Sequence, residues 1–189
     1  MDAPDATPRN SGAAGAAGDG GAAGGAGAAR WTGRLLLRPV TPAVVGALVA
    51  GCRLADWAED YPAEGDLVIA GLLDRAGPAA WSGGDATWGH RQVIERRSGL
   101  VVGGIGFAGP PEHGAVEVGY GIVPSRQGRG YATEAVRLMV ALAWRHPVVT
   151  AVLAQTDPGN VASQRVLEKA GFRRVSAGAQ IGYRLDRTG

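Results

Sequence analysis

Apolar and polar residues along this chain follow two periods, one typical of strands and one typical of helices. Residues 34–40, "RLLLRPV", predict a strand, and residues 43–52, "AVVGALVAGC", predict a short helix entered near Thr41. A second helix is predicted from Asp66 to Arg75. Three strand-like runs follow, "TWGHRQVIERR", "GLVVGGIGFAG" and "GAVEVGYGIV", and short turn sequences separate them. The first half therefore predicts a strand, two helices and three further strands.

The second half predicts a strand, helix, strand crossover and then a further helix. After Pro124, apolar residues recur at helical spacing, at Ala132, Ala135, Val136, Met139, Leu142 and Ala143. Residues 148–156, "VVTAVLAQT", predict a strand buried in a sheet. Residues 157–171 begin with cap-forming residues and end with Gly171, which predicts a helix, and "FRRVSAG" and "QIGYRLD" predict a closing pair of strands. The order β-α-α-β-β-β-α-β-α-β-β predicts a mixed α/β fold.

The first 29 residues have a different composition from the rest. They hold 8 Gly and 11 Ala, and no large aliphatic or aromatic residue follows Met1. Such a segment buries too little apolar surface to offset its ordering entropy, so we expect a disordered tail at 1–29 and one domain at 30–189. The tail lacks the charged start and apolar centre of a signal peptide, and Cys52 has no disulfide partner. We therefore expect a cytoplasmic protein.

The charge balance limits the partners of this domain. Without residues 1–29 the chain has 18 basic and 14 acidic residues, a net charge of +4. This excess suits a phosphorylated small ligand, whereas a nucleic-acid track shows a dense basic stripe, and no apolar run is long enough to span a bilayer. We expect neither a nucleic-acid nor a membrane partner. The histidines, His90, His113 and His146, lack ligands at metal-binding spacing, so no metal site is expected.

Candidate chemistry begins at "SRQGRGYATEAV", residues 125–136, where two glycines precede a predicted helix. Gly128 and Gly130 let the backbone approach a ligand closely, and the helix N-terminus adds partial positive charge. Arg126 and Arg129 add two cations, so the pyrophosphate of a nucleotide-like cofactor is a natural ligand. The spacing alone leaves open a tight turn with solvated arginines. The chain has neither a P-loop nor a dinucleotide-binding motif here.

Two segments together resemble the GNAT superfamily of acyl-CoA-dependent N-acetyltransferases. "EVGYGIVPSRQGRGYATEAV" matches the Gln/Arg-x-x-Gly-x-Gly/Ala signature with Gln127, Gly130 and Ala132. "NVASQRVLEKAGF" is similar to the helix that carries Asn-x-x-Ser and ends in Gly-Phe. With the opening "RLLLRPVTP", the resemblance covers residues 34–185 and is closest to the ribosomal-protein alanine and serine N-acetyltransferases. It implies a mixed, mostly antiparallel sheet with one splayed parallel strand pair.

The resemblance also implies acetyl-CoA as cofactor, with longer donors such as succinyl-CoA left open. The strand over 116–123 would carry a bulge and splay from the strand over 148–156, and the pantetheine arm would lie in the gap. The implied cofactor-binding residues are Ile122, Val123, Arg126, Gln127, Gly128, Arg129, Gly130, Tyr131, Ala132, Thr133, Asn160 and Ser163. Family members often dimerise, so a homodimer is an option.

Catalysis needs a base for the amine and a proton for the leaving thiolate. Glu117 is expected on the strand face opposite Val116 and Val118, and it matches a family carboxylate that often acts as a base through water. The alternative is an exposed or ion-paired carboxylate. The tyrosine that many relatives use as general acid is replaced by Leu167, which leaves Ser163 or solvent in that role. Packing is the favoured role for the other candidates, Tyr120 and Tyr131.

Acceptor binding is predicted in "DWAEDYPAEGD", residues 56–66. There Trp57, Asp60 and Tyr61, together with Glu117, would suit a cationic amine. The alternative is a solvated acidic loop whose aromatic residues pack on the core, and packing is also the favoured role of Trp81 and Trp88. The predicted enzyme acetylates a small-molecule amine or a protein N-terminus. A non-catalytic acyl-CoA-binding sensor is the alternative, supported only by the missing tyrosine.

Overall fold

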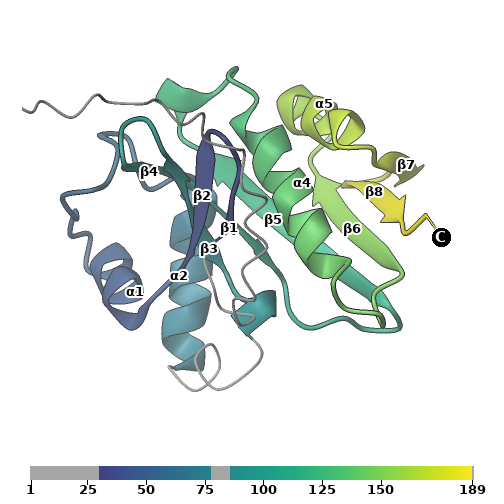
Figure 1. Cartoon of the computed structure of the whole chain (residues 1–189), viewed down its shortest axis with the longest axis horizontal. Coiled ribbons are helices and arrows are strands. Elements are labelled where there is room, and N and C mark those ends of the chain that lie inside the picture. Colours follow the sequence, from purple (N-terminus) through teal and green to yellow (C-terminus); the bar gives the residue numbers. More distant parts are fainter. Residues whose placement is uncertain (1–29, 78–85, 189) are drawn as a thin grey trace, which may run out of the picture.

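A computed structural model describes residues 30–77 and 86–188 of this chain. The predicted tail, residues 1–29, and Trp81 lie outside this part of the chain. The helices and strands follow the predicted order, with one added short strand at the start (Figure 1). They are β1 (Arg30–Trp31), β2 (Leu35–Pro39), α1 (Pro42–Val49), α2 (Glu64–Ala76), η1 (Ala86–Trp88), β3 (Arg91–Glu95), β4 (Leu100–Phe107), β5 (Ala115–Ile122), η2 (Pro124–Arg126), α4 (Tyr131–Ala143), β6 (Ala151–Thr156), α5 (Val161–Lys169), β7 (Arg173–Ser176) and β8 (Ile181–Asp186).

Two predicted strands start later than expected: β6 begins at Ala151 and not at Val148, and β3 begins at Arg91 and not at Thr87. Residues 87–90 form part of the 3₁₀ turn η1 and its exit, and β3 begins only at Arg91. The fully buried guanidinium of Arg91 donates to the carbonyls of Thr87 and Gly89, at 3.0 and 2.9 Å. These bonds hold the preceding segment in a turn, because an extended strand would carry both carbonyls away from the guanidinium. The alternating pattern could not predict this tertiary contact.

The strands form one sheet in the order β1-β2-β3-β4-β5-β6-β8-β7. Neighbouring strands are antiparallel except β5 and β6, which are parallel and joined by the α4 crossover. In Figure 1, α4 lies across one face of the sheet and α2 lies behind the other. The predicted mixed, mostly antiparallel sheet with one parallel pair is confirmed.

Helix α4 anchors the core through its predicted apolar stripe. Ala135, Val136 and Met139 are fully buried, and Leu142 and Ala143 continue the same stripe one turn later. Full burial of a side chain such as Val or Met stabilises a fold by about 1.5 to 3 kcal/mol. Because this stripe faces the sheet, the N-terminus of α4 is fixed beside the end of β5.

Glycines in β4 bring other groups close to the sheet. A Cβ added at Gly103 would lie 2.1 Å from the carbonyl oxygen of Gly121, and one at Gly104 would lie 1.8 Å from Oδ1 of Asp66. At Gly106 it would lie 2.7 Å from Nδ1 of His90. These positions require glycine because the neighbouring atoms already occupy the space of a side chain.

The parallel pair separates after three residues. Ala115 to Glu117 pair with Ala151 to Leu153, and beyond this point β6 continues its pairing with β8 alone. The predicted splay is confirmed (Figure 1). The predicted bulge in β5 is wrong, because the β4–β5 register runs without a shift from Phe107↔Val118 to Gly103↔Ile122. The strands diverge because each keeps its antiparallel partner on the other side, and no inserted residue is needed.

Gly103→Ala is expected to lower the free energy of unfolding by about 2 to 3 kcal/mol, because its methyl group would collide with backbone atoms that cannot move aside cheaply. Gly119→Ala is the control, since an added Cβ there meets nothing within 4 Å. Its effect should stay within about 0.5 kcal/mol. Urea unfolding of both variants measures the difference. Equal losses in the free energy of unfolding would show that the close approach of Gly121 is not the reason for glycine at position 103.

Candidate active site

A cavity of about 520 Å³ lies at the open end of the gap between β5 and β6. The end of β5, the loop before α4, the start of α5 and the start of α2 form its walls. Ten of the twelve predicted cofactor-binding residues line this cavity: Ile122, Arg126, Gln127, Gly128, Gly130, Tyr131, Ala132, Thr133, Asn160 and Ser163. The structure thus brings together residues that are up to 41 positions apart in the sequence.

The other two predicted residues do not line the cavity. Val123 is fully buried, and its N–H donates to the carbonyl of Val102 at 2.9 Å. Arg129 donates to the carbonyl of Ser125 at 3.2 Å and lies 3.7 Å from Glu95, so its guanidinium is directed behind the loop. Of the two loop arginines, only Arg126 lines the cavity.

The loop before α4 presents backbone donors to the cavity. Gly128 and Gly130 have φ angles of 73° and 80°, which favour glycine strongly. Gly130 is the N-cap of α4 and makes no side-chain cap, so the first N–H groups of the helix, from Tyr131 to Thr133, have no intrahelical acceptor. The helix dipole adds partial positive charge at the same place. These donors form a site for an anion.

The edge of β5 presents further backbone groups. The backbone groups of Glu117 and Val123 form hydrogen bonds with β4. The carbonyl of Glu117 accepts from the N–H of Ala108, and the N–H of Val123 donates to the carbonyl of Val102. Backbone direction alternates along a strand, so the groups of Tyr120 and Ile122 face the gap. The Ile122 carbonyl there accepts from the side-chain amide of Gln127 at 2.9 Å, which ties the loop to the strand end.

A tyrosine and a serine meet on the cavity wall. The hydroxyl of Tyr120 lies 2.9 Å from Oγ of Ser163 and 3.2 Å from the Ser163 carbonyl. Burial raises the pKa of Tyr120 to about 12, so the phenol is protonated at neutral pH. The sequence favoured a packing role for Tyr120; the structure places its hydroxyl against a predicted catalytic residue. Asn160 fixes the serine, since its Oδ1 accepts from the Ser163 N–H at 3.0 Å and caps α5.

Tyr131 has a different environment. Its hydroxyl donates to Oε1 of Glu95 at 2.6 Å, and this bond to a carboxylate raises the pKa of Tyr131. The hydroxyl is therefore held beneath the loop. Packing and anchoring, the favoured reading of this tyrosine, account for its position.

Glu117 lies where the parallel pair ends. Its side chain is half-buried, opposite the buried Val116 and Val118, and its Oε2 lies 3.4 Å from Nε2 of Gln155. It does not line the 520 Å³ cavity. It shares its sheet face with Gly119, which is exposed and meets open space. The predicted base therefore stands on the α2 side of the sheet, next to the gap.

The predicted acceptor residues do not form an open pocket. Trp57 and Tyr61 are only 4% and 2% exposed, and their rings make an edge-to-face contact with centroids 4.9 Å apart. Asp60 accepts two hydrogen bonds from Ser125. The packing alternative therefore describes both aromatic side chains. Trp88 also packs, against Phe107 at 5.5 Å between ring centroids.

The structure adds polar contacts that sequence reasoning missed. His90 Nε2 lies 3.3 Å from Oδ1 of the buried Asp66, in space that Gly104 leaves free. The carboxylates of Glu95 and Asp60 accept hydrogen bonds from the anion-binding loop, from Arg126 and Ser125 respectively. The pairs are 24 to 65 residues apart, so no local pattern predicts them. Within residues 30–77 and 86–188, no three His, Cys, Asp or Glu side chains gather so as to hold a metal ion.

Comparison with known proteins identifies the class. Residues 34–173 match the family model of the acetyltransferase (GNAT) domain. The chain therefore belongs to the GNAT family of acetyltransferases, whose acyl donor is acetyl-CoA. In the part of the chain that the structure describes, no helix is long and apolar enough to cross a bilayer.

Three similar proteins illustrate the range of this family. The uncharacterized N-acetyltransferase YjdG of Bacillus subtilis is 33% identical over 81 residues, 42% of this chain and 48% of its own length. The ribosomal-protein-S5-alanine acetyltransferase of Vibrio fischeri is 16% identical, with a TM-score of 0.56 over 84% of this chain and 96% of that one. Aminoglycoside acetyltransferase AAC(6')-Ib in complex with coenzyme A is 20% identical, with a TM-score of 0.56 over 81% and 95%. The chain spans between 32% and 55% of the length of the curated relatives it matches.

The residues present fit an acyl-CoA. The helix N-terminus and Arg126 suit the pyrophosphate, and the free edge of β5 suits the amide groups of a pantetheine arm. A second cavity of about 540 Å³ shares Gly130, Thr133 and Lys169 with the first and adds Arg34 and Arg137. Arg34 is paired there with Glu134, whereas Arg137 and Lys169 would attract the remaining phosphate of coenzyme A.

Gly130→Glu is expected to raise the Kd for acetyl-CoA at least about tenfold, because a carboxylate at the helix N-terminus would repel the pyrophosphate. Isothermal titration calorimetry measures the change. Gly51→Glu is the control, since Gly51 also has a positive φ and open space but lies after α1. Unchanged affinity in Gly130→Glu would contradict the assignment of the anion site.

Proposed function

We propose that this chain transfers the acetyl group of acetyl-CoA to a primary amine by direct attack in a ternary complex. One observation carries the proposal. The cavity at the β5–β6 gap joins an anion-binding helix N-terminus to a tyrosine and serine pair. Acetyl-CoA supplies an activated thioester when bound. The chain's own residues must then orient it, accept a proton from the amine and return one to the thiolate.

Binding follows from the donors on the cavity wall. The N–H groups at the start of α4 and the Arg126 guanidinium hold the diphosphate. The backbone groups of Tyr120 and Ile122 hydrogen-bond the pantetheine arm as a partner for the free edge of β5. An N–H on this edge can also stabilise the oxyanion that develops when the amine attacks.

Tyr120 is the proposed general acid. The usual tyrosine of the family is replaced by Leu167, which is fully buried. Ser163 lies on α5, the helix that also carries Leu167. The hydroxyl of Tyr120, on β5, contacts Ser163. Its raised pKa keeps the proton on the phenol, and Ser163, whose Oγ lies 2.9 Å from the phenol, would pass the proton to the leaving sulfur. The missing tyrosine supported a non-catalytic sensor; a phenol from β5 removes that support and favours the transferase.

Glu117 is the proposed base, acting through water. It stands beside the gap, on the face that carries Gly119 and Gly121. Open space surrounds Gly119, whereas Ala63 packs over Gly121. The acceptor amine would approach across Gly119, so that the carboxylate also attracts an ammonium before its deprotonation.

The acceptor is a small-molecule amine or a protein N-terminus. The similar proteins include both an aminoglycoside acetyltransferase and a ribosomal-protein acetyltransferase, so their names do not separate the two. Release of free CoA from acetyl-CoA would be followed with aminated antibiotics, small amines and amino-acid amides. Turnover with any of them supports the transferase. Binding of acetyl-CoA without turnover on peptides or small amines would favour the sensor.

Tyr120→Phe should lower kcat by about a hundredfold and leave the Kd for acetyl-CoA nearly unchanged, because the ring still fills its place while the proton donor is lost. In the wild type the phenol stays protonated until the pH approaches 12, so tyrosine ionisation should cause no loss of rate between about pH 6 and 9. Tyr183→Phe is the control: its buried hydroxyl donates to Glu168, away from the cavity. Equal kcat values for wild type and Tyr120→Phe would exclude Tyr120 as the acid.

Glu117→Gln should lower kcat/KM at neutral pH by roughly ten- to a hundredfold, because an amide cannot accept the amine proton. Cofactor affinity should not change, since Glu117 lies outside the cavity. The exposed Glu112, in the turn before β5, provides the matched control Glu112→Gln. If both variants keep wild-type rates, the base lies elsewhere.

A further inference from the structure

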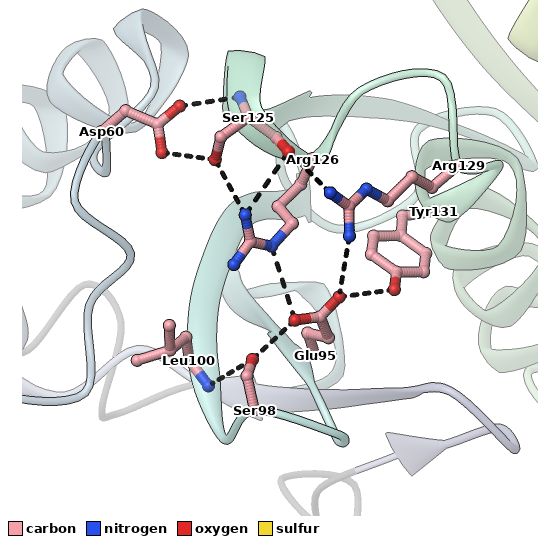
Figure 2. A network of polar contacts seen from close by, with 8 residues as sticks. All are labelled: Asp60, Glu95, Ser98, Leu100, Ser125, Arg126, Arg129 and Tyr131. Atoms are coloured by element: carbon pink, nitrogen blue, oxygen red, sulfur yellow. Dashed lines mark hydrogen bonds and ion pairs between the residues drawn. The ribbon is translucent and has the colours of Figure 1, made fainter.

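The anion-binding loop is held from both sides by carboxylates. Figure 2 shows a chain of polar contacts that runs from Asp60 through Ser125 and Arg126 to Glu95. Asp60 belongs to the connection between α1 and α2, and Glu95 is the last residue of β3. Neither residue lines the cavity. Both act on the loop from behind.

At one end, Asp60 caps the short helix η2. Ser125 donates its N–H to Oδ2 and its Oγ–H to Oδ1 of Asp60, both at 2.8 Å. The N-cap residue of η2, Val123, supplies no side-chain cap of its own. The backbone bond from Ser125 is the largest cause that holds the pKa of the Asp60 carboxyl below its ordinary value. Both oxygens of Asp60 are thus engaged by the loop, and the cap is lost only as the pH falls through this lowered pKa.

The segment that presents Asp60 is itself held by hydrogen bonds from Arg53. Arg53 donates to four carbonyls along it, those of Trp57 (3.2 Å), Ala58 (3.0 Å), Glu59 (2.6 Å) and Tyr61 (3.2 Å). The two aromatic side chains on either side of Asp60 are buried in the core. Asp60 is therefore the side chain through which a fixed segment contacts the loop.

At the other end, Glu95 anchors the base of the loop. Its side chain is 7% exposed and accepts from Ser98 and Tyr131, both at 2.6 Å. Arg126 and Arg129 lie 3.4 and 3.7 Å from its oxygens. Hydrogen bonds from the Ser98 hydroxyl, which has the larger effect, and from the Tyr131 hydroxyl lower the pKa of Glu95. The carboxylate is therefore charged at neutral pH. The loop is therefore fixed at the start of α4, and Asp60 joins the bond from Gln127 to Ile122 in holding its other end.

We propose that Asp60 is a positioning residue of the cofactor site, which links the segment 57–61 to the anion-binding loop. This inference rests on the proposed function of that loop. Through the two bonds to Ser125, Asp60 holds η2 and Arg126 in the geometry that receives the diphosphate. Acyl-CoA binding then stabilises the segment 57–61 through the same bonds. Ser125 engages one lone pair on each Asp60 oxygen, which favours a positioning role over binding of the acceptor amine.

The first test compares truncations by calorimetry with acetyl-CoA, on samples that circular dichroism shows to be folded. Asp60→Ala should raise the Kd about five- to twentyfold, the effect of losing two hydrogen bonds to a charged group. Ser125→Ala should raise the Kd by a smaller factor. The double variant should bind acetyl-CoA no more weakly than Asp60→Ala alone. Asp60→Asn should restore much of the affinity, since its amide can still pair with Ser125. Glu59→Ala, an exposed carboxylate one residue away, should have no effect.

The second test follows hydrogen exchange in peptides covering 57–61 and 124–131, with and without coenzyme A. In the wild type, coenzyme A should slow exchange in both peptides. In Asp60→Ala it should slow exchange only in 124–131. Slowing confined to 124–131 in the wild type as well would overturn the proposed link.

Two further outcomes would overturn the proposal in different ways. An increase in acceptor KM for both Asp60→Ala and Asp60→Asn, with the Kd for acetyl-CoA unchanged, would make Asp60 an acceptor ligand. Equal losses of acetyl-CoA affinity in Glu59→Ala and Asp60→Ala would mean that the loss comes from removing a negative charge near the loop and not from the bonds to Ser125. Failure of the proposed function is distinguishable from failure of this proposal: if the anion site is wrong, the wild type does not bind acetyl-CoA and Gly130→Glu changes nothing, and if catalysis is wrong, acetyl-CoA binds without turnover.

Discussion

The separation of β5 from β6 after Glu117 is the constraint on which the site depends. A parallel pair normally satisfies its backbone groups along its whole length. Here pairing stops at Glu117↔Leu153, and β6 continues with β8. The groups of Tyr120 and Ile122 are left facing a gap. A ligand with its own amide groups can complete the edge, so the site follows from how the sheet is built.

The helices that flank this gap supply the chemistry because the core fixes them. The buried stripe of α4 sets its N-terminus beside the end of β5, where Gly130 leaves the first N–H groups of the helix open. Helix α5 begins across the gap, capped by Asn160, and brings Ser163 to the Tyr120 hydroxyl. The anion site and the proton donor thus stand at opposite walls of one cavity.

Glycines in β4 and β5 set how closely the second layer approaches the sheet. Gly104 leaves the space that Oδ1 of Asp66 occupies, next to His90, and Gly121 lies beneath Ala63 at the start of α2. This close packing fixes the connection between α1 and α2 near the anion-binding loop. Asp60 can therefore reach Ser125, although the two lie 65 residues apart. The connection between α1 and α2 and the anion-binding loop become parts of one polar network (Figure 2).

The sequence by itself determined the order of elements, the amphipathic α4 and the glycine loop before it, because periodicity and turn residues act over a few neighbouring positions. Ten of the twelve cofactor residues that the family resemblance implied line one cavity. Only the tertiary structure decided the roles of single side chains. Tyr120 reaches Ser163, Trp57 and Tyr61 enter the core, and Asp60 bonds the loop. These outcomes depend on contacts between distant segments, which no local pattern encodes.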